Sequence, residues 1–211
     1  MASLTLYHAA PSRSAIVHWM LEEIGEPFDL HLLDLKKGEG HTPEYLAINP
    51  LGKVPVLKHG DTVISEAAAI CTYLADEFPH ARLNIPVGNP QRGVYLKWLF
   101  FGPSCVEPAI MDKAFPRKEA PPPGAIGSGD YDSVVEILAK AAANANPYLM
   151  GEQFTAADVI IGSGLRWGTM FNLLPKRSKF TAYLARLAER PALQRAVTKD
   201  AELQKQHEAG G

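Results

Sequence analysis

The first eighty residues carry two kinds of hydrophobic pattern, one typical of strands and one typical of helices. Leu4–Tyr7 and Phe28–Leu33 alternate apolar and polar positions, as half-buried strands do. Between them, four apolar residues recur at the spacing of one helical face: Val17, Met20, Leu21 and Ile24. Gly25 and Pro27 follow and are expected to end that helix. The pattern predicts strand, helix and strand in that order.

A hairpin pattern and a second helix follow. The stretch "VPVLKHGDTVIS" has two short apolar runs separated by a His-Gly-Asp turn, which predicts a β-hairpin. Residues 43–48 predict a short helix before it. After it, Ser65 is the expected N-cap of a helix whose apolar residues share a face: Ile70, Tyr73, Leu74 and Phe78. A right-handed crossover makes the first two strands parallel, and the hairpin adds an antiparallel pair. We therefore predict a small mixed sheet with helices packed on it.

The pattern changes after Phe78. Residues 80–90 are rich in Pro and Gly and are typical of a linker. Beyond them we find helical patterns only, including a capping box with Thr155 as N-cap and Asp158 at the third helical position. The tail after Lys199 is expected to fray. We predict a domain at residues 1–79, a linker at 80–90 and an all-helical domain at 91–211.

Composition and charge narrow the classes of function. A hydrophobic fraction of 46% is enough to build a sizeable core. The net charge is −2 and no basic run occurs, so we expect neither nucleic acid nor a membrane as partner. The beginning lacks a secretory pattern, and Cys71 and Cys105 lie far apart without metal-ligand spacing. These features predict a reduced, cytoplasmic protein that holds no metal.

Three segments of the first half could carry chemistry. Ser12 and Ser14 precede the first helix, Pro55 stands where a strand begins, and Glu66 opens another helix. Helix N-termini offer free backbone N–H groups and a positive dipole end, which suit an anionic ligand. Taken singly, each has an ordinary explanation, because serine is a common N-cap and an acidic residue in a first turn complements the dipole.

Taken together, these segments resemble the cytosolic glutathione S-transferase family over nearly the whole chain. The resemblance covers "LYHAAPSRSAIVHWMLEEIG", "NPLGKVPVL", "SEAAAICTYLADEFP" and "YLMGEQFTAADVIIG". It implies a thioredoxin-like N-terminal domain with a βαβ-ββα mixed sheet, followed by an all-α helical-bundle domain. It also implies glutathione as co-substrate and a homodimer. Ser12 falls where serine-type members of the theta, delta and zeta kind keep their activating serine, and where beta-class members keep a cysteine.

The resemblance assigns roles to further residues of the first half. Val54 is expected to bind the cysteinyl part of glutathione through its backbone N–H and C=O, with Pro55 in the cis form. Glu66 is expected to hold the γ-glutamyl amine. Lys53 pairs with a glutathione carboxylate or is simply solvated, and His41 lies in the loop that reaches the glycyl end. Ser14 is the weaker candidate for thiol activation, since a side chain inside the helix is expected to point away, and the role of Arg13 stays open.

Two positions depart from the family pattern. Ala67 stands where the family usually has a serine that binds the γ-glutamyl carboxylate. Its backbone N–H remains in the predicted site, but one charge-assisted hydrogen bond is lost. Ile16 replaces an arginine that is often found in the first helix. Both departures keep a non-catalytic binding protein for glutathione or a hydrophobic ligand open as the alternative.

The resemblance places the electrophile site between the domains, against helices of the second half. Its candidate residues are Trp98, Phe101, Cys105 and Trp167. Aromatic residues at helical spacing are also typical of a core. The expected activity is conjugation of glutathione to a hydrophobic electrophile, as in detoxification. Isomerase and peroxidase chemistry stay open, whereas thiol-transferase or dehalogenase chemistry calls for a cysteine in place of Ser12.

Overall fold

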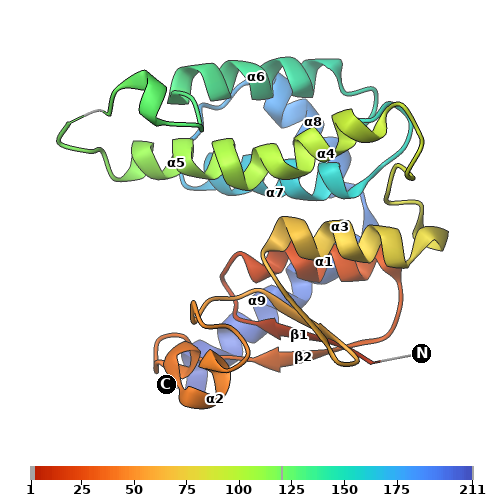
Figure 1. Cartoon of the computed structure of the whole chain (residues 1–211), viewed down its shortest axis with the longest axis vertical. Coiled ribbons are helices and arrows are strands. Elements are labelled where there is room, and N and C mark those ends of the chain that lie inside the picture. Colours follow the sequence, from red (N-terminus) through yellow and green to blue (C-terminus); the bar gives the residue numbers. More distant parts are fainter. Residues whose placement is uncertain (1–2, 120, 211) are drawn as a thin grey trace. The chain divides into compact units, whose positions relative to one another are not determined.

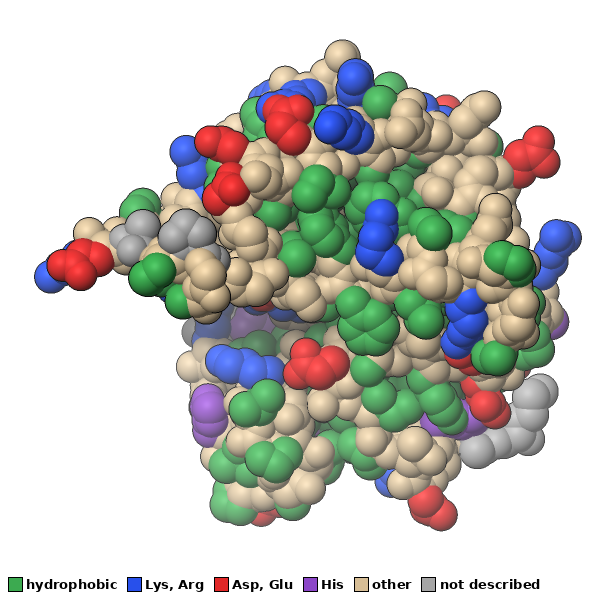
Figure 2. All heavy atoms as spheres, turned by 45° about the horizontal axis from the view of Figure 1, so that its top comes forward, with side chains coloured by type: hydrophobic (Ala, Val, Ile, Leu, Met, Phe, Trp, Pro, Cys, Tyr) green, Lys and Arg blue, Asp and Glu red, His purple; other side chains and the backbone are tan. Residues whose placement is uncertain are grey.

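The computed structural model describes residues 3–119 and 121–210. They form two compact units, one made of residues 1–81 together with 190–211 and the other of residues 82–189 (Figure 1). This differs from the predicted division, because the C-terminal helix belongs to the first unit and not to the helical half. Charged side chains of both signs are scattered over the face seen in Figure 2, in line with the small net charge.

The first unit contains the predicted four-stranded mixed sheet. Its strands are β1 (Leu4–His8), β2 (Phe28–Leu32), β3 (Val56–His59) and β4 (Thr62–Ser65). The strand order is β2-β1-β3-β4, with β1 parallel to β2 and antiparallel to β3, and with β3 and β4 forming the hairpin. This arrangement confirms the thioredoxin-like fold that the sequence predicts.

Helices α1 (Ser14–Ile24) and α3 (Ala67–Glu77) lie side by side over this sheet (Figure 1). The four apolar residues predicted to form one face of α1 are all buried: Val17, Met20, Leu21 and Ile24. The helix ends at Gly25, whose φ of 77° is left-handed and whose N–H donates to the Leu21 carbonyl at 3.1 Å. Shorter helical pieces complete this part of the unit: Glu39–His41, α2 (Pro43–Leu46) and Pro79–Ala81.

The predicted fraying of the tail is wrong. Helix α9 (Pro191–Gly210) is continuous and packs along α1. Charged contacts hold the two helices together: Arg195 bonds Glu22 at 2.6 Å, and His18 bonds Asp200 at 2.6 Å. The tail looks like a polar terminus in the sequence because its partners lie far away along the chain.

The helix caps partly differ from prediction. Ser65 is the last residue of β4, so the N-cap of α3 is Glu66, which makes no side-chain cap bond. The N-cap position of α1 is Arg13, but Ser12 still accepts a hydrogen bond from the Ser14 N–H at 3.1 Å. The predicted capping box of Thr155 and Asp158 is confirmed.

The second unit is helical. It contains α4 (Arg92–Phe101), a π-helical turn (Gly102–Val106), α5 (Glu107–Ala114), α6 (Tyr131–Asn144), α7 (Ala156–Met170), α8 (Ser178–Ala188) and a 3-10 turn (Pro123–Ala125). The π-helical turn packs on α7, where Gly102 faces Ile160. Within residues 3–119 and 121–210, no helix is long and apolar enough to cross a membrane.

Candidate functional site

The strand register brings the three predicted segments to one edge of the sheet. Tyr7 pairs with Val56, and Val56 pairs with Ser65. The chain that leaves β1, the chain that enters β3 and the chain that leaves β4 therefore meet at this edge. They carry Ser12, the Val54–Pro55 dipeptide and the Glu66–Ala67 dipeptide, respectively.

Ser12 is half-buried beside the first turn of α1. Its Oγ accepts the Ser14 N–H at 3.1 Å and lies 2.6 Å from the Ser14 Oγ. The hydroxyl therefore satisfies an N–H of the first helical turn and sits at the positive end of the helix dipole. Ser12 therefore caps the first turn of α1 and also holds its hydroxyl group in a fixed position at the helix N-terminus.

Ser14 does not point away from the site, contrary to the sequence-based expectation. It is fully buried as the first residue of α1. Besides its contact with Ser12, its Oγ lies 2.8 Å from His8 Nδ1 and accepts the Ala9 N–H at 3.2 Å. Ser14 thus links the half-buried Ser12 to a buried histidine.

His8, His18 and Asp200 form a polar cluster that the sequence analysis missed. Asp200 Oδ1 lies 2.6 Å from His18 Nδ1 and 3.2 Å from His8 Nε2. The second is an electrostatic contact, because the buried His8 Nε2 has no hydrogen-bond partner among the described residues. Burial raises the pKa of Asp200, but the hydrogen bond with His18, the close approach of His8 and the charges of both rings outweigh it and lower that pKa to about 2. Asp200 is therefore an anion at neutral pH.

The sequence held one signal for this cluster. Leu4, Leu6 and His8 are the inward-facing positions of β1, so the period of two places His8 in the core. The three side chains also satisfy the spacing of a metal-ligand group, with ligand atoms within 4.8 Å of one another. The 2.6 Å separation between Asp200 and His18 is that of a direct hydrogen bond, which accounts for the cluster without an ion.

The backbone at Val54 is held open at the edge of the sheet. The Val54–Pro55 peptide bond is cis, in agreement with the expectation. The preceding Lys53 carbonyl is fixed by the Tyr45 hydroxyl and the Asn49 amide, each at 2.7 Å. Among the described residues, the Val54 N–H and C=O have no hydrogen-bond partner, which leaves both for an extended ligand.

Glu66 and Ala67 stand where β4 passes into α3. Glu66 is exposed and has a φ of 70°, which is unusual for a residue other than glycine. Its carboxylate makes no ion pair with another described residue. Ala67 is the first helical residue, so its N–H belongs to the free donors of the first turn. The junction of β4 and α3 therefore presents the Glu66 carboxylate and the Ala67 N–H next to each other.

Lys53 and His41 are both exposed near the same edge. A Cβ on Gly52 would lie 2.9 Å from two atoms of the His41 ring, so the loop that carries His41 lies directly against the residue before Lys53. Gly52 also has a φ of 63°, which favours glycine there. The structure thus brings these two predicted residues close together.

The four candidate electrophile residues lie in the helical unit. Trp98 on α4 is buried, and its ring meets Phe101 edge-to-face with the centroids 5.7 Å apart. Cys105 is half-buried in the π-helical turn, and burial raises the pKa of its thiol. Trp167 on α7 is half-buried and packs on Phe171 at 5.1 Å. Within the described ring contacts, Trp98 and Phe101 come together, whereas Trp167 pairs elsewhere.

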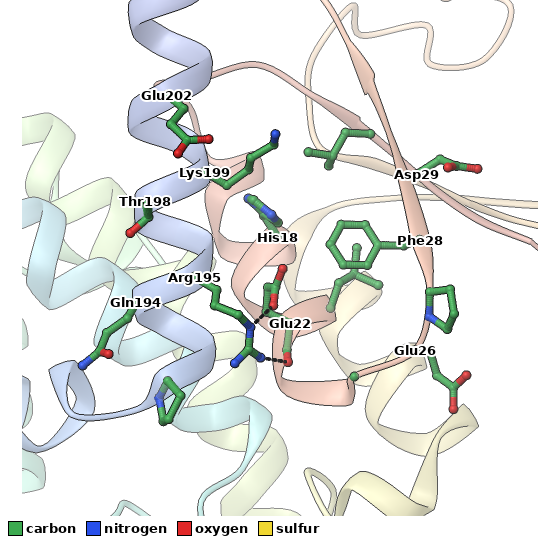
Figure 3. Close-up of a pocket in the computed structure, with 15 residues that line it drawn as sticks. His18, Glu22, Glu26, Phe28, Asp29, Gln194, Arg195, Thr198, Lys199 and Glu202 are labelled. Carbon is green, nitrogen blue, oxygen red and sulfur yellow. Dashed lines mark hydrogen bonds and ion pairs between the residues drawn. The ribbon is translucent and has the colours of Figure 1, made fainter.

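A separate open groove of about 1060 Å³ runs between α1, the start of β2 and α9. In Figure 3, Arg195 reaches across to Glu22, and His18 lies between α9 and Phe28. The groove contains none of the predicted glutathione residues.

Comparison with known proteins gives a consistent result. Residues 2–76 match the family model described as the glutathione S-transferase N-terminal domain. The chain is 30% identical to glutathione S-transferase GstA of Escherichia coli O157:H7 over 201 residues, which cover 92% of this chain and 98% of that protein.

Two solved structures extend the likeness over the whole fold. A glutathione transferase from Methylococcus capsulatus is 29% identical, with a TM-score of 0.76 and coverage of 94% of this chain and 98% of that chain. The transferase URE2P6 from Phanerochaete chrysosporium, solved in complex with oxidized glutathione, is 27% identical, with a TM-score of 0.78 and coverage of 96% and 98%. As the motifs predict, the chain belongs to the glutathione S-transferase family.

Proposed function

We propose that the chain binds glutathione at the sheet edge, that Ser12 stabilises its thiolate, and that the thiolate attacks a hydrophobic electrophile. One observation carries the proposal. The Ser12 hydroxyl, at the N-terminus of α1, shares this edge with the Val54 backbone groups and the Glu66 carboxylate, which have no hydrogen-bond or ion-pair partner among the described residues.

The binding roles follow from the chemistry of glutathione. Val54 pairs with the cysteinyl backbone in antiparallel fashion, which fixes the sulfur near Ser12. The Glu66 carboxylate attracts the γ-glutamyl amine, and the Ala67 N–H donates to the γ-glutamyl carboxylate. Lys53 and His41 face the glycyl carboxylate. These assignments place each charge of the peptide opposite a group that complements it.

The energies are sufficient for ionisation at neutral pH. A free thiol has a pKa of about 8.5. A hydroxyl donor to a charged sulfur contributes about 1.5–3 kcal/mol, and a helix N-terminus about 0.3–1 kcal/mol more. At about 1.36 kcal/mol per unit, this lowers the thiol pKa by roughly 1.5–3 units. Bound glutathione is then between about half and almost fully thiolate at pH 7.

A pH titration of bound glutathione, followed by the ultraviolet absorbance of the thiolate, tests this proposal. We expect a depressed thiol pKa in the wild type that returns toward the free value in Ser12→Ala. Thr72→Ala is the matched control, because the Thr72 hydroxyl donates to the Ala68 carbonyl within its own helix, at 2.7 Å. Saturable binding with an unshifted thiol pKa in the wild type would contradict thiol activation.

A carrier without efficient catalysis is the second candidate, and Ala67 is the residue that favours it. Alanine cannot give the γ-glutamyl carboxylate a hydroxyl donor. The same titration separates the two functions, since a carrier binds glutathione without shifting its thiol pKa. Peroxidase activity needs only the thiolate, so it belongs with the first candidate, as does the less favoured isomerase activity. Substrate assays separate both from conjugation.

We propose further that the electrophile binds in the helical unit near Trp98 and Phe101, with Cys105 and Trp167 as the other candidate residues. We also propose that this activity serves detoxification in the cytoplasm and that the protein uses no metal. We also propose a homodimer, because closed two-fold pairs are the commonest oligomers. Light scattering tests the dimer, and a monomeric mass would contradict it.

A further inference from the structure

A chain of polar contacts runs from Ser12 into the core of the first unit. Ser12 Oγ lies 2.6 Å from Ser14 Oγ, which lies 2.8 Å from His8 Nδ1. On the far side of the ring, His8 Nε2 lies 3.2 Å from Asp200 Oδ1. Ser14 and His8 are fully buried, and half-buried Ser12 forms the end at the sheet edge.

We propose that this chain receives the proton that the glutathione thiol gives up, with His8 as the final acceptor and Asp200 as the positioning residue for the protonated ring. The inference rests on the proposed function, because it needs a thiol next to Ser12. The relay supplies a base that accepts the thiol proton, which a serine hydroxyl alone does not provide.

The step conserves atoms and charge. The thiol proton moves to Ser12 Oγ, the Ser12 proton moves to Ser14 Oγ, and the Ser14 proton moves to His8 Nδ1. The S–H bond breaks and leaves its electron pair on sulfur, while an N–H bond forms at Nδ1. Both serines remain neutral hydroxyls, and the products are a thiolate and an imidazolium.

Before the transfer, the contacts satisfy every hydrogen-bonding position of the Ser14 hydroxyl and all but one of the Ser12 hydroxyl. Ser14 donates to His8 Nδ1 and accepts the Ala9 N–H and the Ser12 hydroxyl. Ser12 donates to Ser14 and accepts the Ser14 N–H, which leaves one lone pair for the thiol. The proton of His8 is then on Nε2, facing Asp200.

After the transfer, the same contacts are satisfied in the opposite direction. His8 Nδ1 donates to Ser14, and Ser14 donates to Ser12 while still accepting the Ala9 N–H. Ser12 accepts from both the hydroxyl and the N–H of Ser14, so its own proton is free to donate to the thiolate. No side chain has to move, which makes the chain a preformed path.

Asp200 supplies the charge that the imidazolium needs. The groups that face His8 are the Asp200 carboxylate from α9 and the Ser14 hydroxyl and His18 ring from α1, the two rings lying 5.4 Å apart. Asp200 is held in place by its 2.6 Å contact with His18. A fixed anion beside Nε2 stabilises the ring when Nδ1 also carries a proton.

Proton release on glutathione binding tests the inference directly. The full-length protein is titrated with glutathione at about pH 8, where an imidazole in water is neutral. Calorimetry in two buffers with different ionisation enthalpies gives the protons released, and absorbance gives the thiolate formed. S-methylglutathione, which has no thiol proton, gives the baseline for the rest of the ligand.

In the wild type we expect thiolate to form with almost no proton released above that baseline. In Ser14→Ala the path is cut, so each thiolate formed releases about one proton to solvent. In Asp200→Asn, which keeps the size of the side chain, we expect at least a tenfold smaller equilibrium constant for thiolate formation. Arg195→Gln is the matched control for Asp200→Asn, since it breaks another contact between α9 and α1, at 2.6 Å, and should bind like the wild type.

Release of about one proton per thiolate in the wild type would overturn the relay and leave Ser12 as the activating group. Absence of thiolate in the wild type would overturn the proposed function and the relay together. The two failures are therefore distinguishable from the wild-type protein alone, even if one variant does not fold.

Discussion

Arg190 and Glu23 are joined by two hydrogen bonds of 2.6 Å, formed by the Nε and Nη2 atoms of the guanidinium with the two carboxylate oxygens. Glu23 lies on α1 and is almost buried, with 5% of its side chain exposed. Glu23 Oε1 also accepts the Trp19 indole N–H at 2.8 Å. This pair fixes the beginning of α9 on the first unit.

We expect Arg190→Gln to destabilise the protein by about 3 kcal/mol, because it leaves a nearly buried carboxylate without its cation. Arg177→Gln is the matched control, since its 2.7 Å pair with Glu136 is exposed and should contribute less than about 1 kcal/mol. Urea unfolding of both variants measures the difference. Equal losses of stability would contradict the assigned role of Arg190.

The packing of α9 on the first unit could not be predicted from the sequence, whereas the strands and α1 could. The strands and α1 were predictable because their apolar residues repeat with periods of two and 3.6. Asp200 looked like one more charge in a polar tail, since its partners His8 and His18 are distant in sequence. Periodicity reports which face of an element is buried, and it does not report which distant element covers that face.

In the candidate site, too, some residues could be predicted from the sequence and some contacts could not. Ser12, Val54 and Glu66 were assigned from motifs, and the strand register brings them to one edge. The Ser14 contact with His8 was missed because helical spacing alone does not predict a side chain that turns back toward the strand before it. The prediction that Ser65 is the N-cap of α3 was wrong, because the chain turns into the helix at Glu66, which adopts a positive φ. The type of side chain at position 66 does not predict that backbone conformation.

Acid stability should depend on Asp200. Its pKa falls from 3.8 to about 2 in the folded protein, so the unfolded chain binds more protons between these values. The stabilisation is present above about pH 4 and is lost as the pH falls toward about 2, with a size of about 2 kcal/mol. Urea unfolding across this range should show a smaller pH dependence in Asp200→Asn. An unchanged slope would contradict the lowered pKa.

Two glycines of α7 should respond in opposite directions to substitution by alanine. A Cβ on Gly168 would overlap Leu174 and lie 3.2 Å from Ile110, whereas a Cβ on Gly164 would meet Val106 at an ordinary 3.5 Å. We expect Gly168→Ala to lose about 1–3 kcal/mol through overpacking. Gly164→Ala should gain up to about 1 kcal/mol from helix propensity. Thermal unfolding of the two variants measures both, and destabilisation of Gly164→Ala would show that this helix face is tighter than the structure indicates.

Restoring a hydroxyl at position 67 should strengthen glutathione binding. Ala67 is the first residue of α3 and partly exposed at the site edge, so a serine there can donate to the γ-glutamyl carboxylate without new burial. A hydrogen bond to a charged group contributes about 1.5–3 kcal/mol, or roughly 10- to 150-fold in affinity. Calorimetry on Ala67→Ser measures the gain.

Ala69→Ser, at an exposed position of the same helix, is the control and should bind like the wild type. If both variants bind alike, the γ-glutamyl carboxylate does not accept a hydrogen bond at the start of α3, which would contradict the role proposed for position 67.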